Sequence, residues 1–543
     1  MATRVDLVWL GGASRPPLWK IGSVVECAAS APGVNGLILQ SANATSADAW
    51  LFWDSALLAP DPEVCLSLLR GPGDLWHAGL TLGEGGRPGI ADLVIPTWTL
   101  NRDPDPHAEA TSWRISLRAC LVRTSVLRWG APRGDFASLA GAALEWGHRC
   151  IMYGVLPRFT PTLLGASAGV QSESPPLVDE LRFARHRFGV RWAGWAAFRA
   201  ILSGYAALEE VGDAWIATRG VRVAHPPRPF VSARSSNRRT APTISVLIPT
   251  LERYSYLRTV LAQLRTQTVP PSEIIVIDQT PAALRDESIA RDFADLPLVL
   301  ISLDQAGQCT SRNVGLARAK GDAILFLDDD DEIDGDLIAR HLAHLAATGA
   351  EVSSGVAREP GSGPLPEAFT RERVSDVFPT HNTLALRSAL ERSGLFDLAY
   401  DHGTRADGDL GMRIYLAGAV MWLAPSISVL HHHAPRGGLR AHKARIITYG
   451  SSRRRITQRH LPDVTELYRA MRYFSPVQVR EMVIQSALGT LSAHGSIIRR
   501  MPKLAYGLAL MPLTIVQLRR RLAAAREMLG RYPQIPSLAP RSR

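Results

Sequence analysis

Four consecutive aspartates, Asp328 to Asp331, directly follow the apolar run 323–327. Adjacent carboxylates repel one another, and a divalent cation such as Mg2+ or Mn2+, which prefers oxygen ligands, relieves that repulsion. A solvated acidic turn after a buried strand has the same pattern. The quartet therefore indicates either a metal site or an exposed turn, and the pattern of other residues must decide between these interpretations.

Further polar side chains follow similar apolar runs. Asp278 ends the run 273–278, on an edge where a nucleotide base could lie. Gly307 and Arg312 flank the start of a predicted helix, where close backbone approach and positive charge suit a phosphate. The remaining candidates are Asp407 and Asp409 at the start of an amphipathic helix and His431, His432 and His433 at the end of a predicted strand. Taken singly, the histidines also fit an exposed polar loop.

The segments that must position these residues alternate between strand and helix patterns. Short apolar, β-branched runs of the kind found in buried parallel strands lie at 243–249, 273–278, 298–304 and 323–328. Helical spacing of Leu257, Val260, Leu261 and Leu264 separates the first two. The pattern predicts an α/β domain with a mostly parallel sheet, whose ligands bind beyond the carboxyl ends of the strands.

Together these segments resemble glycosyltransferase family 2. The motifs run from Ile244 to His433 and read ISVLIPT, IIVID, GQ, SRN-GLA-A-GD-ILFLDDDDEI, ADGDLGMR-YLAG and P-ISVLHHH. Their order, spacing and residue types agree with the family. The resemblance implies a GT-A fold, the Rossmann-like α/β fold of nucleotide-diphospho-sugar transferases.

The resemblance also implies roles for individual residues. Asp328 and Asp330 match the outer positions of the family's DXD metal motif, with Asp329 and Asp331 as an alternative register, and His431 takes the place of a histidine near the metal. Asp278 corresponds to the aspartate that reads the nucleotide base. The implied donor-binding set is Pro249, Thr250, Glu252, Asp278, Gly307, Arg312 and Asp328.

Two positions depart from the family pattern. Glu252 stands where family members usually carry Asn, before a matching Arg253. The family's Glu-Asp pair is Ala406-Asp407 here, so only the second acid remains. Asp407 is the expected general base, and Asp409 is the alternative.

The implied function is metal-dependent transfer of a sugar from a nucleotide-sugar donor to the hydroxyl of a saccharide or lipid-linked acceptor, with inversion. Such a reaction belongs to polysaccharide or glycoconjugate synthesis. A positioned carboxylate must take the hydroxyl proton, because a free hydroxyl does not ionise at neutral pH. Two alternatives are a non-catalytic scaffold that binds nucleotide-sugar or glycan and a sugar nucleotidyltransferase.

The first part of the chain resembles the second. AWLFWDSALLAPDPEV, residues 49–64, aligns with AILFLDDDDEIDGDLI, residues 323–338, so that Asp54 pairs with Asp328. Ser55 and Ala56 then replace the carboxylates on the metal side. We expect a degenerate GT-A-like domain without catalysis, the alternative being coincidence between two α/β domains.

These observations predict five regions. They are a degenerate α/β domain at 1–160, a helical extension at 161–224, a Pro/Arg/Ser linker at 225–242, the catalytic domain at 243–435 and a helical Arg-rich region at 436–543.

Charge is distributed unevenly over these regions. The chain has a net charge of +11, yet residues 435–543 contain 21 arginines and lysines against 4 acids, so the rest is net acidic. A basic tail on an acidic body suggests an anionic partner for the tail and argues against a nucleic-acid enzyme. The segment 503–521 is either a core helix with a basic end or a helix that lies on an anionic membrane.

The cysteines and the N-terminal residues bear on location. Five scattered cysteines without a CxxC pair argue against a disulfide scaffold and a zinc module and fit a reducing compartment. No signal-peptide pattern and no run of about eighteen apolar residues is found. We expect a cytoplasmic protein, or one peripheral on the inner face of the membrane.

Overall fold

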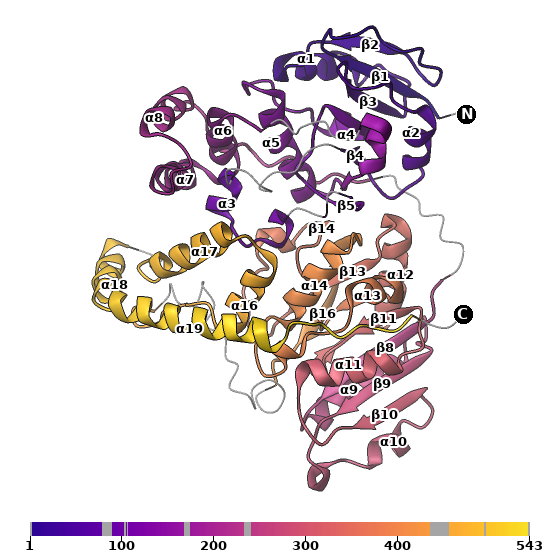
Figure 1. The fold of residues 1–543 in the computed structure, drawn as a ribbon. Coiled ribbons are helices and arrows are strands. Elements are labelled where there is room, and N and C mark those ends of the chain that lie inside the picture. The colour runs from indigo at the N-terminus through magenta and orange to yellow at the C-terminus, as the bar shows by residue number, and fades with distance from the viewer. Residues whose placement is uncertain are drawn as a thin grey trace.

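The computed structural model describes residues 3–78, 89–102, 105, 107–167, 174–232, 241–434, 455–493 and 496–540. Figure 1 shows two α/β domains, one above the other, with helices from both halves of the chain beside them. Part of the predicted linker (233–240) and part of the predicted tail (435–454) lie outside the described residues.

The first domain is built on a seven-stranded sheet with the order β2-β1-β3-β6-β4-β7-β5. Its strands are β1 (Val5–Leu10), β2 (Val24–Cys27), β3 (Ala49–Asp54), β4 (Leu75–His77), β5 (Ala110–Thr111), β6 (Ala119–Arg123) and β7 (Pro157–Phe159). The helices are α1 (Ala31–Ser41), α2 (Pro62–Leu68), α3 (Ile90–Val94), α4 (Thr124–Trp129) and α5 (Leu139–Met152), followed by α6 (Leu177–Phe188), α7 (Val190–Leu202) and α8 (Leu208–Ala217).

The second domain contains a nine-stranded sheet with the order β10-β9-β8-β11-β15-β13-β16-β12 and with β14 also paired to β16. Its strands are β8 (Ile244–Thr250), β9 (Glu273–Asp278), β10 (Leu298–Ser302), β11 (Ala323–Phe326), β12 (Asp331–Glu332), β13 (Val352–Arg358), β14 (Arg373–Val374), β15 (Thr383–Leu386) and β16 (Met421–His431). Its helices are α9 (Tyr254–Arg265), α10 (Ser288–Asp292), α11 (Gln308–Arg318), α12 (Leu337–Thr348), α13 (Arg387–Ser393) and α14 (Ala406–Leu416).

The predicted α/β organisation is confirmed. The four predicted strands appear as β8 to β11, and the apolar residues predicted on α9 are all buried. Strands β10, β9, β8 and β11 are parallel, but β15 runs antiparallel to both β11 and β13. The sheet is therefore parallel in its first half and mixed in its second, which corrects the expectation of a mostly parallel sheet throughout.

The two sheets share one topology. In the second domain, β9-β8-β11-β15-β13-β16-β14 reproduces the order β2-β1-β3-β6-β4-β7-β5 strand for strand and in the same chain order. All six pairings also agree in direction, three of them parallel and three antiparallel. Strand β1 starts opposite Ala49 and β8 starts opposite Ala323, so Asp54 and Asp328 occupy matching positions.

The last helices form a block against the second domain, namely α16 (Val464–Tyr473), α17 (Pro476–Gly489), α18 (Ile497–Ala509) and α19 (Met511–Arg531). This block also contacts the helices of the first part of the chain. Arg199 on α7 forms two 2.8 Å hydrogen bonds with buried Glu481 on α17. Between the sheets, Arg158 donates to the Gly418 carbonyl at 3.1 and 3.2 Å. These contacts hold the two halves of the chain together.

Candidate active site

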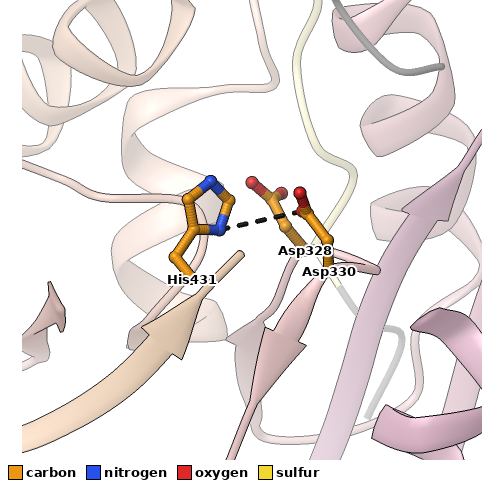
Figure 2. A group of neighbouring side chains, drawn as sticks. All are labelled: Asp328, Asp330 and His431. Carbon is orange, nitrogen blue, oxygen red and sulfur yellow. Dashed lines mark ion pairs between the residues drawn. The ribbon is translucent and has the colours of Figure 1, made fainter. Parts of the chain in front are cut away.

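The acidic quartet begins just after β11, and a short strand pairing brings a distant histidine to it. Strand β12 runs antiparallel to the end of β16 and places Asp331 opposite His431, 100 residues later in the chain. Figure 2 shows Asp328, Asp330 and His431 grouped at this point. One candidate ligand atom from each of the three lies within 4.8 Å of the others. The structure thus assembles the three residues predicted to hold a metal.

Asp330 offers an available oxygen in this group. Its side chain is 1% exposed, and its Oδ2 accepts a 2.7 Å hydrogen bond from the Ala434 amide. Its Oδ1 is buried without a hydrogen-bond partner among the described residues, although Arg253 lies 3.2 Å away and His431 Nδ1 3.7 Å away. A buried carboxylate oxygen normally has a partner. Two carboxylates and one imidazole therefore fit a divalent cation of the Mg2+ or Mn2+ type.

The other two aspartates, Asp329 and Asp331, are hydrogen-bonded to neighbouring protein groups. Asp329 accepts hydrogen bonds from Thr250 Oγ1 at 2.7 Å and from Arg253 at 3.0 Å. Asp331 accepts from the Asp328 amide at 2.8 Å and lies 2.8 Å from His431 Nδ1. These contacts favour the register Asp328 with Asp330 over Asp329 with Asp331.

Burial and charge shift the pKa values of this cluster. Burial raises the pKa of Asp329 to about 6 and that of Asp331 to about 7. Burial disfavours the charged form of His431, but its hydrogen bond to Asp331 and the neighbouring carboxylates raise its pKa to about 9. Burial opposes ionisation of Asp328 as well, yet Arg312 and His431 lower its pKa. Asp328 thus stays negatively charged in this buried cluster because the positive charges of Arg312 and His431 lie beside it.

The predicted donor residues lie at the same edge of the sheet. Thr250 and Asp278 end the adjacent strands β8 and β9 and are paired in register, and Pro249 precedes Thr250. Asp278 is buried and accepts from Tyr254 Oη at 2.7 Å and from the Thr280 amide at 2.9 Å. Asp278 therefore sits beside the quartet, within reach of one bound molecule, because Thr250 contacts Asp329.

Arg312 is placed for its predicted contact with a donor, whereas the surroundings of Gly307 do not fit the predicted phosphate contact. Arg312 donates to Asp328 at 2.9 Å. The first amides of α11, those of Cys309 and Thr310, are already bonded to the Asp401 carboxylate at 2.8 and 2.9 Å. A Cβ atom on Gly307 would lie 2.4 Å from Asp401. The expected phosphate role of Gly307 and this helix start is therefore corrected: the glycine makes room for a capping aspartate.

Asp407 and Asp409 have different surroundings, although both lie in the first turn of α14. Asp409 is fully buried, pairs with Arg413 at 2.9 Å and accepts from Tyr473 Oη at 2.7 Å. Asp407 is exposed, and its Oδ1 accepts from the Gly408 amide at 2.7 Å. An acceptor hydroxyl can reach only the exposed carboxylate. The structure thus corrects the expectation that Asp409 could replace Asp407.

His381 is a site residue that the sequence analysis missed. Its ring stacks on that of His431, with centroids 5.5 Å apart. Burial lowers the pKa of His381, whereas the charges of Asp328 and Asp407 raise it, so both carboxylates lie near this ring. The antiparallel strand β15 brings it there, because Thr383 pairs with Phe326 of β11 and the residues before Thr383 then lie beside the quartet.

Backbone strain marks the same region. Among the described residues, three non-glycine residues have positive φ angles, Glu252 (56°), Arg405 (76°) and His433 (50°). Glu252 precedes α9, Arg405 is the N-cap of α14, and His433 follows β16. Such conformations are uncommon and concentrate at functional sites. Exposed Glu252 follows the end of β8, where its amide donates to Thr280 Oγ1 at 2.9 Å, and its predicted donor contact stays a prediction.

Comparison with known families agrees with this site. Residues 245–404 match the family model described as "Glycosyl transferase family 2". The predicted resemblance is thereby confirmed for this stretch. Asp407 and His431 lie beyond the matched residues, so their assignment rests on the geometry above.

Two curated proteins with similar sequences are named as glycosyltransferases. The chain is 33% identical over 89 residues to "Uncharacterized glycosyltransferase YwdF" of Bacillus subtilis, covering 16% of this chain and 32% of that protein. It is 34% identical over 97 residues to "Putative glycosyltransferase EpsH" of the same organism, covering 18% and 28%. The matches therefore span about a third of these relatives or less.

A solved structure with partial likeness is "Mannosyltransferase PcManGT from Pyrobaculum calidifontis in complex with GDP-Man and Mn2+". It has a TM-score of 0.37 and 19% identity, and the alignment covers 66% of this chain and 99% of that one.

Proposed function

We propose that this chain is a metal-dependent glycosyltransferase that moves a sugar from a nucleotide-sugar donor to an acceptor hydroxyl. The observation that carries the proposal is the grouping of Asp328, Asp330 and His431 in a domain that matches glycosyl transferase family 2, with a buried oxygen on Asp330 that accepts no hydrogen bond from the described residues. A divalent cation held there would act as a Lewis acid for the charge that develops on the departing diphosphate.

The chain's own residues supply the remaining steps. Arg312 holds Asp328 in place and adds positive charge beside the diphosphate position. Asp407 takes the proton of the acceptor hydroxyl as it attacks. We infer a single displacement, in which the hydroxyl attacks the anomeric carbon directly as the diphosphate leaves, so that the configuration at that carbon inverts. The acceptor is a saccharide or a lipid-linked saccharide.

A second proposal concerns the first domain, which we infer to be a non-catalytic copy of the second. It is supported by the shared strand order and by Ser55 and Ala56 at the positions of the metal-side aspartates. Its role would be to support the catalytic domain through the contacts of Arg158 and Arg199.

The test is a transfer assay with labelled sugar. A panel of nucleotide-sugars is first screened for thermal stabilisation of the full chain with Mn2+, with and without a chelator. The donor that stabilises is then incubated with saccharide acceptors. Metal-dependent transfer supports the proposal, and stabilisation without transfer to any acceptor favours the scaffold alternative. Formation of nucleoside triphosphate and sugar 1-phosphate from the donor when pyrophosphate is added favours a nucleotidyltransferase.

A further inference from the structure

The strongest unexplained surface lies where α18 meets α19. We call residues 497–520 the elbow surface. Its large apolar side chains are exposed, and they are Ile497 (65%), Ile498 (79%), Met501 (55%), Leu508 (54%), Leu513 (46%), Ile515 (43%) and Val516 (44%). Scattered exposed apolar residues are normal, but seven large ones within two successive helices are unusual for a soluble surface and indicate an interaction site.

The opposite face of the same helices is firmly packed. Lys503 is buried and donates to the carbonyls of Arg455 and Gln458. Thr514 and Leu518 of α19 are buried as well, and Arg521 donates to the Pro462 carbonyl at 2.7 Å. The helices are therefore anchored with a fixed orientation, and the exposed apolar side chains are those that face away from the body.

The charge of this segment is one-sided. Residues 482–526 contain seven arginines and lysines and no aspartate or glutamate. Arg500, Arg519 and Arg520 are exposed beside the apolar side chains of the elbow surface. Apolar side chains between arginines, with no acid in the same segment of the chain, complement a surface that is apolar inside and negative outside, as an anionic bilayer is.

The shape of the pair favours lying on a bilayer over crossing it. Among the described residues, no single helix is long and apolar enough to span a membrane. The segments Arg500–Ala509 and Met511–Arg531 pass that test only together and are bent by 61°. In Figure 1, α18 and the start of α19 lie at the left edge of the molecule, and α7 and α8 lie along the same edge. Helix α7 also exposes Trp192 and Phe198, and α8 exposes Leu208 and Ile216.

We propose that the elbow surface docks on an anionic phospholipid bilayer. Its apolar side chains enter the boundary between headgroups and acyl chains, and its arginines contact lipid phosphates. The same helical block touches the start of α14: Arg405 pairs with Glu466 at 2.5 Å, and Thr404 bonds to Asp463 at 2.5 Å. Docking therefore also fixes how Asp407 faces the bilayer.

The experiment is flotation of the full chain with vesicles of phosphatidylcholine, alone or with phosphatidylglycerol. It needs no donor or acceptor, so its result is independent of the proposed activity. We expect binding to the anionic vesicles, weakened by salt. Combined Arg500→Gln, Arg519→Gln and Arg520→Gln should lower the partition coefficient roughly 100-fold, since each arginine near an anionic surface contributes about 1 kcal/mol.

An apolar variant and a matched control complete the design. Ile498→Ser with Met501→Ser should lower binding to anionic vesicles at least roughly tenfold. Leu39→Ser with Leu58→Ser removes equally exposed side chains from the first domain and should leave binding unchanged. Equal binding by wild type and both elbow variants overturns the proposal, as does equal binding to neutral vesicles. Conversion of a dimer to a monomer by the apolar variant, without lipid binding by wild type, would instead assign the surface to a second copy.

Discussion

The carboxyl ends of β3 and β11 occupy the same place in the same topology, yet their surroundings differ. Asp54 ends β3 and Asp328 lies just after the end of β11, at matching positions. Each pairs with an arginine, Arg118 at 2.6 Å and Arg312 at 2.9 Å. After Asp328 come three more aspartates, whereas after Asp54 come Ser55 and Ala56.

The space above β3 is filled by the chain itself. The amide of Ala13 donates to Ser55 Oγ at 3.0 Å, and Ser14 Oγ donates to the Ser55 carbonyl at 2.6 Å. The loop after β1 therefore closes onto Ser55, the residue that matches Asp329 of the quartet. In the second domain the corresponding loop, after β8, carries Arg253, which contacts two aspartates of the quartet.

The nucleotide side differs as well. Strand β9 is fully buried between β8 and β10, whereas β2 is an edge strand with largely exposed side chains. The chain between β1 and β2 forms no helix, so the first domain lacks the counterpart of α9 and of Tyr254, which holds Asp278. A shared fold thus does not imply shared chemistry, because a few residues beyond the strand ends decide it.

The largest expected effect of a single substitution is that of Asp330→Asn. Transfer should fall on the order of 1,000-fold, because a Lewis acid contributes several kcal/mol to such a step. Stabilisation of the protein by Mn2+ should disappear. The melting temperature without metal should stay the same or rise, because the substitution removes a negative charge that repels the buried Asp329 carboxylate. Burial, and after it the Asp330 charge, raise the pKa of Asp329. Wild-type transfer by the D330N enzyme would remove the metal site from the mechanism.

The pair Asp407 and Asp409 comes next. Asp407→Asn should reduce turnover by roughly 100- to 10,000-fold, the range of general-base catalysis, with donor affinity unchanged. Asp409→Asn should instead destabilise the fold by about 3–5 kcal/mol, because it breaks a buried pair with Arg413. Turnover and thermal melting measured on both variants separate these roles. A stable D409N enzyme with lost turnover would make Asp409 the base.

Local sequence patterns predicted the parts of this site that depend on one strand and the residues after it. The strands β8 to β11 and the quartet follow from apolar runs and adjacent carboxylates. The burial of Asp409 could not be predicted, because it depends on Tyr473 from a helix 64 residues later. The same holds for Gly307, whose neighbour Asp401 is 94 positions away.

The antiparallel strand β15 was also missed, and His381 with it. An isolated four-residue run such as Thr383–Leu386 does not reveal the direction in which it pairs. The direction of β15 decides which of its ends lies beside the quartet. His381 could therefore not be predicted without long-range contacts. The first domain has the same arrangement, since β6 runs antiparallel to β3 as β15 does to β11.

The smallest expected effect belongs to the matched position in the first domain, Asp54→Asn. Its pair with Arg118 is partly exposed, so the loss should cost about 1 kcal/mol of stability or less. Transfer and Mn2+ stabilisation should match wild type, in contrast to D330N. The hydrogen bond from the Ala56 amide to Asp54 Oδ1, 2.8 Å long, can be kept by the amide oxygen of Asn. Loss of metal or donor binding in the D54N protein would show that the first domain contributes to the site, and the two strand ends would then be two functional positions rather than one.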